Sequence, residues 1–349
     1  MTRLLLCLLF LSGTLMLPSQ AEEKLPRPAF PLKVKLHAEG DPVLTWDEPK
    51  DERVLNRRVM LRSTTDLRTT KNALVFPIAG LLANSSYSQF RDWEAPQDVQ
   101  LHYQLRLDFA DGKKVYSEVA TITVPAPKLP KLGHPVIAVD KRTYTLSLID
   151  EKGTTLRRFP IALGQNPKGR KLHYDRACTP EGIYKIYALQ PNATFYRAYD
   201  LDYPNDVDRA RHSLATQANQ ETPDIGGEIQ IHGDGIEENW TAGCIALRDR
   251  DMDLLFSLPA INRGTTVIIS GTELDHTDLL SDIMLTPQQR KAFHEQMIQL
   301  GVSSGRTPKH WVYGLCRLQA ENGLRVTGIF DRATRKLLVL KKQKAKAAR

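Results

Sequence analysis

The chain has 349 residues, of which 41% are hydrophobic and 25% are charged, and its formal net charge at pH 7 is +8. This composition excludes a disordered protein, and the length allows two or three domains with cores of their own. The modest positive charge suits a protein that works near anionic polymers or envelope surfaces.

Residues 1–21 have the pattern of a secretory signal peptide. A short basic region, Met1-Thr2-Arg3, precedes an apolar run over 4–17, and Ser19-Gln20-Ala21 offers a small-x-small cleavage site. A membrane anchor is the weaker interpretation, because the apolar run is short and is interrupted by Ser12-Gly13. We therefore expect a secreted protein of the periplasm or cell envelope, which meets the membrane only through its cleaved signal peptide.

Three cysteines follow the signal peptide: Cys178, Cys244 and Cys316. An odd number in an oxidising compartment leaves at least one thiol unpaired, and Cys244 is the natural candidate. Whether Cys178 and Cys316 pair stays open at this point, because the sequence does not set their separation.

Residues 27–125 predict a β-sandwich. Short alternating runs separated by turn-rich segments indicate strands at 43–46, 58–62, 101–107 and 119–124. Trp46 and the Tyr103-x-Leu105-x-Leu107 strand make this part similar to a fibronectin type III domain, which would serve as a spacer or docking module. A proline-rich linker is expected over 126–133.

Residues 134–270 predict a second β-rich domain. Strands are expected at 136–139, 143–149, 157–163, 182–188, 194–203, 228–231 and 265–269, and helices at 206–220 and 249–256.

Two reactive side chains lie close together in this second domain. His232 stands at the end of a predicted strand in Ile231-His232-Gly233, and Cys244 follows twelve positions later in Thr241-Ala242-Gly243-Cys244. An imidazole that takes the thiol proton would convert Cys244 to the reactive thiolate, and backbone N–H groups near Gly243 could bind an oxyanion. The plainer alternative is a structural histidine and a buried cysteine, whereas zinc-like ligand spacing is lacking.

Six short segments, taken in order, resemble the L,D-transpeptidase (YkuD-like) catalytic domain family. They are 163–171, Thr179-Pro180-Glu181-Gly182-Ile183-Tyr184-Lys185-Ile186, Tyr203-Pro204-Asn205-Asp206-x-Asp208, 231–233, 241–247 and Gly264-Thr265-x-Val267-x-Ile269. The resemblance implies that Cys244 attacks the bond between a diamino acid and a terminal D-amino acid of a peptidoglycan stem peptide, which forms a thioester. It also implies that His232 is the base, that the Gly233 main chain orients it, and that the Gly243 and Cys244 N–H groups line the oxyanion site.

The sequence departs from the family pattern at two positions. The family usually has a second histidine before the Gly-Cys pair and an Arg or Asn two positions after the cysteine, where this chain has Ala242 and Ala246. These departures leave the acceptor step open, so that water could replace the amine. Thr241, Arg248 and Tyr203 are the candidate substrate-binding residues, and the alternatives are a solvated arginine and a packing tyrosine.

Residues 285–345 predict a small helical domain. Thr286 caps a helix with Pro287 in its first turn that runs through Leu300, and a second helix is expected over 309–321. Residues 318–338 resemble a peptidoglycan-binding domain, with Val326, Phe330 and Leu337 as core residues; a purely structural helical cap is the alternative.

The sequence therefore predicts a multidomain, mainly β protein: a β-sandwich, a central β-rich L,D-transpeptidase domain and a small helical domain. The expected partners are peptidoglycan stem peptides and, alternatively, a wall-attached acceptor protein, with no nucleic acid, no metal and no organic cofactor. The alternatives are an L,D-carboxypeptidase or endopeptidase that hydrolyses stems or releases wall-linked protein, and a non-catalytic wall-binding protein.

Overall fold

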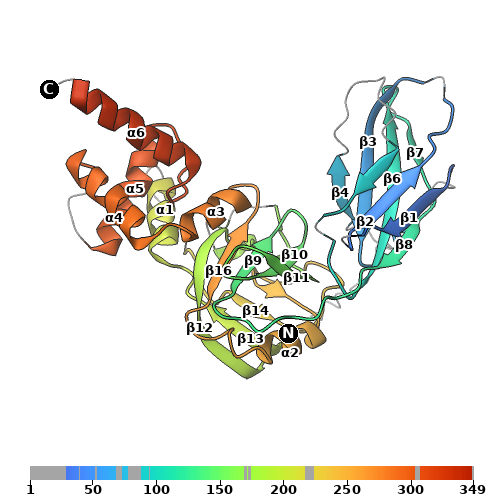
Figure 1. Ribbon diagram of the computed structural model, residues 1–349, viewed down its shortest axis with the longest axis horizontal. Coiled ribbons are helices and arrows are strands. Elements are labelled where there is room, and N and C mark those ends of the chain that lie inside the picture. The colour runs from blue at the N-terminus through green and yellow to red at the C-terminus, as the bar shows by residue number, and fades with distance from the viewer. Residues whose placement is uncertain are drawn as a thin grey trace, which may run out of the picture.

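The computed structural model describes residues 29–38, 40–51, 53–67, 73–77, 88–93, 95–168, 171, 174–216, 224–302 and 307–347. It confirms a multidomain, mainly β architecture with a helical C-terminal part (Figure 1). The sandwich and the helical part rise from opposite ends of the central part. The predicted signal peptide lies outside the described residues.

The sandwich consists of two antiparallel sheets. One contains β1 (Leu32–Leu36), β2 (Pro42–Trp46) and β5 (Gln89–Arg91). The other contains β4 (Leu74–Pro77), β3 (Leu55–Ser63), β6 (Gln100–Phe109) and β7 (Lys114–Tyr116), with β8 (Ala120–Thr123) paired to β6. Alternate residues of β6 face the core, so Leu101, Tyr103 and Leu105 are fully buried, as the period-two pattern predicted.

The central part is built on one eight-stranded sheet in the order β11-β10-β9-β16-β12-β13-β14-β15. The strands are β9 (Val136–Asp140), β10 (Thr145–Ile149), β11 (Thr155–Pro160), β12 (Gly182–Ala193), β13 (Tyr196–Leu201), β14 (Gln230–His232), β15 (Ile245–Ala246) and β16 (Thr266–Ser270). Helices α1 (Asp206–Thr216) and α2 (Asp249–Phe256) and a short 3-10 turn, Tyr174–Arg176, complete it. The core holds apolar residues from all of the central strands, among them Ile137, Phe159, Tyr199 and Ile245.

Four helices follow the sheet: α3 (His276–Ile283), α4 (Pro287–Gln299), α5 (Pro308–Glu321) and α6 (Arg332–Ala347). Thr286 and Gln289 form the predicted cap of α4 as a reciprocal capping box. Asp275 caps the first turn of α3 with its side chain, and Leu279 on the inner face of this helix is buried. Phe330 is 1% exposed, so it is a core residue as predicted.

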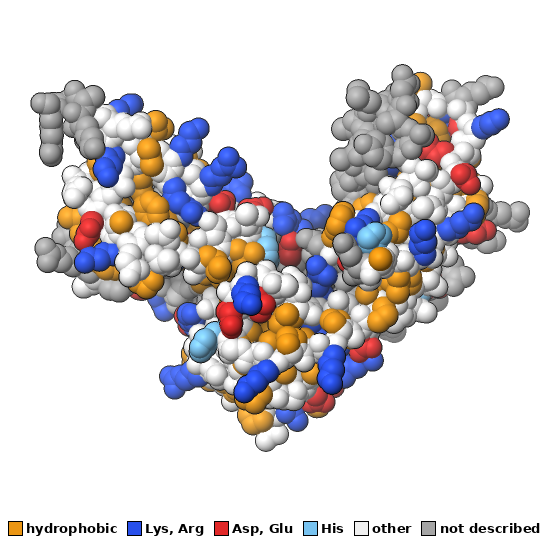
Figure 2. Space-filling model, in the orientation of Figure 1, with side chains coloured by type: hydrophobic (Ala, Val, Ile, Leu, Met, Phe, Trp, Pro, Cys, Tyr) orange, Lys and Arg blue, Asp and Glu red, His pale blue; other side chains and the backbone are white. Residues whose placement is uncertain are grey.

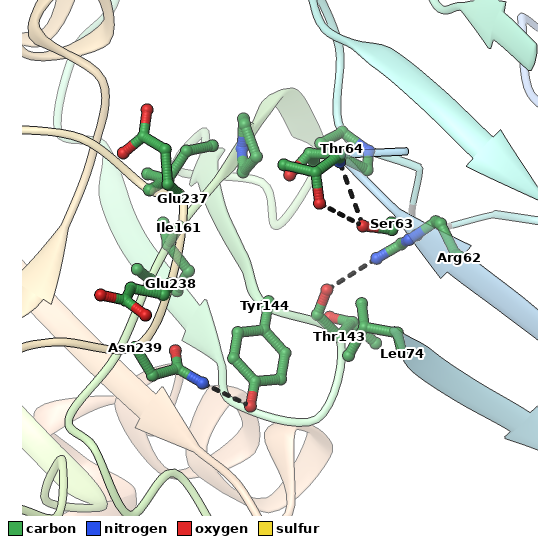
Figure 3. Close-up of a pocket in the computed structure, with 15 residues that line it drawn as sticks. Arg62, Ser63, Thr64, Leu74, Thr143, Tyr144, Ile161, Glu237, Glu238 and Asn239 are labelled. Carbon is green, nitrogen blue, oxygen red and sulfur yellow. Dashed lines mark hydrogen bonds between the residues drawn. The ribbon is translucent and has the colours of Figure 1, made fainter. Parts of the chain in front are cut away.

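The sandwich is fixed to the central part by buried polar contacts. Arg62 of β3 donates to the Thr143 carbonyl across the boundary, as Figure 3 shows, and its ion pair with Asp92 is 2.7 Å long. The backbone N–H of Gln97 donates to the Arg158 carbonyl at 3.1 Å. These contacts make the sandwich a docked module rather than a free spacer.

Candidate active site

Two parallel strands bring His232 and Cys244 together. His232 ends β14, Cys244 immediately precedes β15, and the register pairs Ile231 with Ile245 and His232 with Ala246. Both side chains line one cavity of about 560 Å³ at this end of the sheet. His232 is thus held on a strand of the sheet, and Cys244 ends the loop that leads into the adjacent strand.

His232 is held in a defined tautomer. Its Nδ1 lies 2.8 Å from the Gly233 carbonyl oxygen, which can only accept, so Nδ1 carries the proton and Nε2 keeps its lone pair. The ring is 1% exposed and lies against Phe195 and Trp240, with centroids 5.1 Å and 5.3 Å away. Burial lowers the pKa of His232, so the ring is a neutral base at pH 7.

Cys244 is half-buried and its thiol is held by main-chain groups. The Gln230 N–H donates to Sγ at 3.4 Å, and Sγ–H donates to the Glu228 carbonyl at 3.5 Å. Burial raises the pKa of the thiol, and the Gln230 N–H opposes this rise. These surroundings favour a neutral thiol, which shares the cavity with the neutral imidazole of His232.

The loop before Cys244 requires glycine. Gly243 has φ +135°, and a Cβ added there would lie 2.6 Å from the Cys178 carbonyl oxygen. Its N–H donates to Thr241 Oγ1 at 3.2 Å, and that hydroxyl donates to the Cys244 carbonyl at 2.8 Å. Gly243 and Thr241 thus shape the loop, and the Gly243 N–H, expected in the oxyanion site, is already engaged.

Arg248 and Tyr203 lie outside the cavity. The Arg248 guanidinium pairs with Asp251 and donates to the Asp98 carbonyl of the sandwich at 2.8 Å. Tyr203 is 6% exposed and its hydroxyl donates to the Ile225 carbonyl at 3.0 Å. These contacts give Arg248 and Tyr203 structural roles away from the cavity that contains Cys244.

The cavity contains residues that the sequence did not single out. They are Tyr187, Gln190, Ala193, Thr194, Phe195, Asp200, Glu228, Ile229, Gln230 and Trp240. Most come from β12, β13 and the hairpin between them, which lie far from Cys244 in sequence. The sequence could have indicated Gln230 and Trp240, because they lie shortly before His232 and Cys244 in the chain. Asp200, in contrast, reaches the site only through the pairing of β13 with β14.

Residues 134–269 match the family model of the YkuD L,D-transpeptidase catalytic domain. The central part belongs to this L,D-transpeptidase domain family. YafK of Escherichia coli K12, itself described as a candidate L,D-transpeptidase, is 28% identical over 131 residues, which are 36% of this chain and 47% of YafK. The chain thus spans about half the length of the curated relatives it matches.

Solved structures with local similarity include an L,D-transpeptidase from Xylanimonas cellulosilytica, at 17% identity over 42% of this chain and 64% of that chain, with a TM-score of 0.28. A fibronectin type III-like protein from Clostridium thermocellum is 22% identical over 30% of this chain and 97% of that chain, with a TM-score of 0.21. The L,D-transpeptidase assignment rests on the family match, and the fibronectin-like character of the sandwich stays a prediction.

Proposed function

We propose that this protein is a peptidoglycan L,D-transpeptidase that works through a thioester on Cys244. One observation carries the proposal: Cys244 and His232 line the same cavity, and His232 Nδ1 is held at 2.8 Å from the Gly233 carbonyl oxygen. This arrangement supports the proposal, because a nucleophile, a base and a group that orients the base are what acyl transfer through a thioester requires.

The first half-reaction transfers the acyl group to the enzyme. His232 Nε2 takes the thiol proton as Cys244 Sγ attacks the carbonyl carbon of the diamino acid. The Cys244 N–H is the proposed oxyanion donor, because the Gly243 N–H is engaged by Thr241. Collapse of the tetrahedral intermediate breaks the C–N bond, and the imidazolium gives its proton to the departing amine of the D-amino acid.

The second half-reaction restores the thiol. An acceptor amine attacks the thioester carbonyl, His232 takes a proton from that amine, and the C–S bond breaks as the proton returns to sulfur. The acceptor is a second stem peptide, which gives a cross-link, or an amine of a wall-attached protein. Neither half-reaction needs a metal or an organic cofactor.

Hydrolysis is the second candidate function. Ala242 is exposed and lines the cavity at the position where the family usually has a further histidine. Ala246 is fully buried in the sheet beside Ala162, so it presents nothing to the cavity. A site that lacks these acceptor-binding side chains would let water resolve the thioester, and the protein would then be a carboxypeptidase or endopeptidase.

We place the protein in the cell envelope, on the strength of the signal-peptide pattern and the substrate class. Among the described residues, no helix is long and apolar enough to cross a membrane. Residues 285–349 contain 14 Lys and Arg against 3 Asp and Glu, a net charge of +11, whereas the whole chain carries +8. Figure 2 shows several of these basic side chains on the helical part. The charge supports a wall-binding role for this part, since wall polymers are anionic.

Mass spectrometry of stem tetrapeptides on wall fragments tests the proposal, with the full protein compared with Cys244→Ala. Cross-linked or amine-exchanged products from the unmodified protein alone would support the transpeptidase. Tripeptides or released stems alone would make the hydrolase the better account. Identical spectra from both proteins would contradict an enzymatic role on this substrate and favour a wall-binding protein.

A further inference from the structure

The cavity beside Cys244 contains one buried carboxylate that the proposed mechanism does not use. Asp200 lies on β13 directly opposite Gln230 of β14, and it is 7% exposed. Its side chain is part of the cavity wall. A carboxylate this deeply buried is costly unless a positive group or several donors compensate it.

Among the residues that the structure describes, only amide groups compensate Asp200. Gln190 Nε2 donates to both carboxylate oxygens at 2.8 Å and 2.7 Å, and Gln230 Nε2 donates to Oδ1 at 2.7 Å. A carboxylate offers about four lone-pair directions, so these three bonds leave acceptor capacity. Within the described part of the chain, no Lys or Arg forms an ion pair with Asp200 or lines the cavity. The carboxylate is thus held in place by neutral donors and lacks a counter-charge.

Asp200 is close to the reacting sulfur. The Gln230 side chain bonds to Asp200, while the Gln230 main-chain N–H bonds to Cys244 Sγ at 3.4 Å. Glu228, whose main-chain carbonyl accepts the hydrogen bond from the thiol, adds a second carboxylate to the lining. Lys171 acts on the thiol from outside this lining, and Arg248 lies at the sandwich boundary. The wall beside the nucleophile is therefore anionic.

We infer that Asp200 determines specificity by binding the side-chain ammonium of the donor's diamino acid. The inference rests on the proposed function, because it places the acyl carbonyl of that amino acid at Cys244. An ammonium fits this wall because it supplies both the missing counter-charge and a donor for the remaining acceptor positions. A neutral or acylated side chain would leave the buried carboxylate without a counter-charge. The preference for a donor with a free side-chain amine therefore arises from charge and not from shape.

Binding to the Cys244→Ala protein tests the inference without requiring turnover. We would titrate it by calorimetry with L-Ala-γ-D-Glu-L-Lys-D-Ala and with the same peptide acetylated on the lysine side chain. The free amine should bind at least about tenfold more tightly, as a charge-assisted hydrogen bond implies. Asp200→Asn in the same background should reduce this ratio below about threefold. Glu237→Gln, which removes an exposed charge outside the cavity, should leave the ratio unchanged.

Equal binding of the two peptides by the Cys244→Ala protein would overturn the inference, and so would an unchanged ratio in Asp200→Asn. The inference would also be overturned if Asp200 strengthened the binding of an isolated acceptor amine while acetylation of the donor peptide had no effect on its binding. Circular dichroism of Asp200→Asn shows whether the variant is folded. The comparison of the two peptides on the Cys244→Ala protein, which keeps Asp200, does not depend on the folding of that variant. Failure of the proposed function appears elsewhere, as the absence of a Cys244 thioester with either peptide.

Discussion

The Arg62 guanidinium, buried in the sandwich, donates a hydrogen bond of 2.6 Å to the main-chain carbonyl of Thr143 in the L,D-transpeptidase domain. The next residue, Tyr144, receives a hydrogen bond at its hydroxyl from Asn239, which directly precedes Trp240 (Figure 3). Trp240 lies against His232. Hydrogen bonds, a ring contact and two pairs of adjacent residues therefore connect the sandwich to the proposed base.

Replacing Arg62 with alanine should strongly destabilise the protein. Arg62 and Asp92 are 2% and 3% exposed, and removal of the guanidinium would leave a buried carboxylate without its cation. The expected loss is about 3–5 kcal/mol, measured by denaturant unfolding. Arg57→Ala is the matched control, because Arg57 pairs with Asp108 while 56% exposed, and it should cost less than about 1 kcal/mol. Equal losses from both variants would contradict a structural role of the buried pair.

The Cys244 thiol should react slowly with alkylating reagents at neutral pH. Burial raises its pKa, so the thiolate fraction is lower than in free cysteine and grows only as the pH rises above about 8.5. The rate of iodoacetamide labelling between pH 6 and 10, followed by intact mass, measures this. Cys244→Ala serves as the control, since Cys178 and Cys316 are buried, form no disulfide within the described part of the chain, and should stay unlabelled. A labelling midpoint below pH 7 would instead indicate a resting thiolate–imidazolium pair.

Gly243→Ala should impair the site more than an equally strained substitution elsewhere. Gly243 and Gly264 both have positive φ, +135° and +96°, so alanine is strained at either position. Only at Gly243 would the new Cβ also meet a backbone atom, the Cys178 carbonyl oxygen at 2.6 Å. We expect thioester formation to fall at least about a hundredfold in Gly243→Ala, because the loop that carries the nucleophile must move. Gly264→Ala should keep activity within about threefold, and a similar loss in both would refute the steric explanation.

Asp208 should make the protein less stable as the pH rises from about 4 to 6. Burial raises its pKa from 3.8 to about 6, so the folded state holds a proton that the unfolded chain releases in this range. The group's stabilising contribution is full below pH 4 and is lost as the pH passes 6, by up to about 3 kcal/mol. Asp208→Asn keeps an acceptor for the Tyr184 hydroxyl, which donates at 3.1 Å, and removes the titration. Its melting temperature should exceed that of the parent at pH 7.5 but not at pH 4, and a constant difference would exclude this titration as the cause.

The pattern of the sequence determined much of the protein. Alternating runs such as the one from Leu101 to Leu107 predicted the sandwich strands, because one face of each is buried. Capping and proline signals placed α4 at Thr286–Pro287. The short spacing of His232 and Cys244, with the motifs around them, pointed to a cysteine nucleophile and its base.

Only the tertiary structure decided what surrounds that pair. Asp200 reaches the cavity through the pairing of β13 with β14, and Arg248 is drawn away by Asp98, which lies 150 positions earlier in the chain. The sequence also did not reveal the protonation states of His232 and Cys244. Phe195 and Trp240 lie against His232, and burial shifts the pKa of both groups toward their neutral forms. Local patterns encode which face of a segment is buried, whereas contacts between distant segments and the desolvation they cause arise only when the sheet assembles.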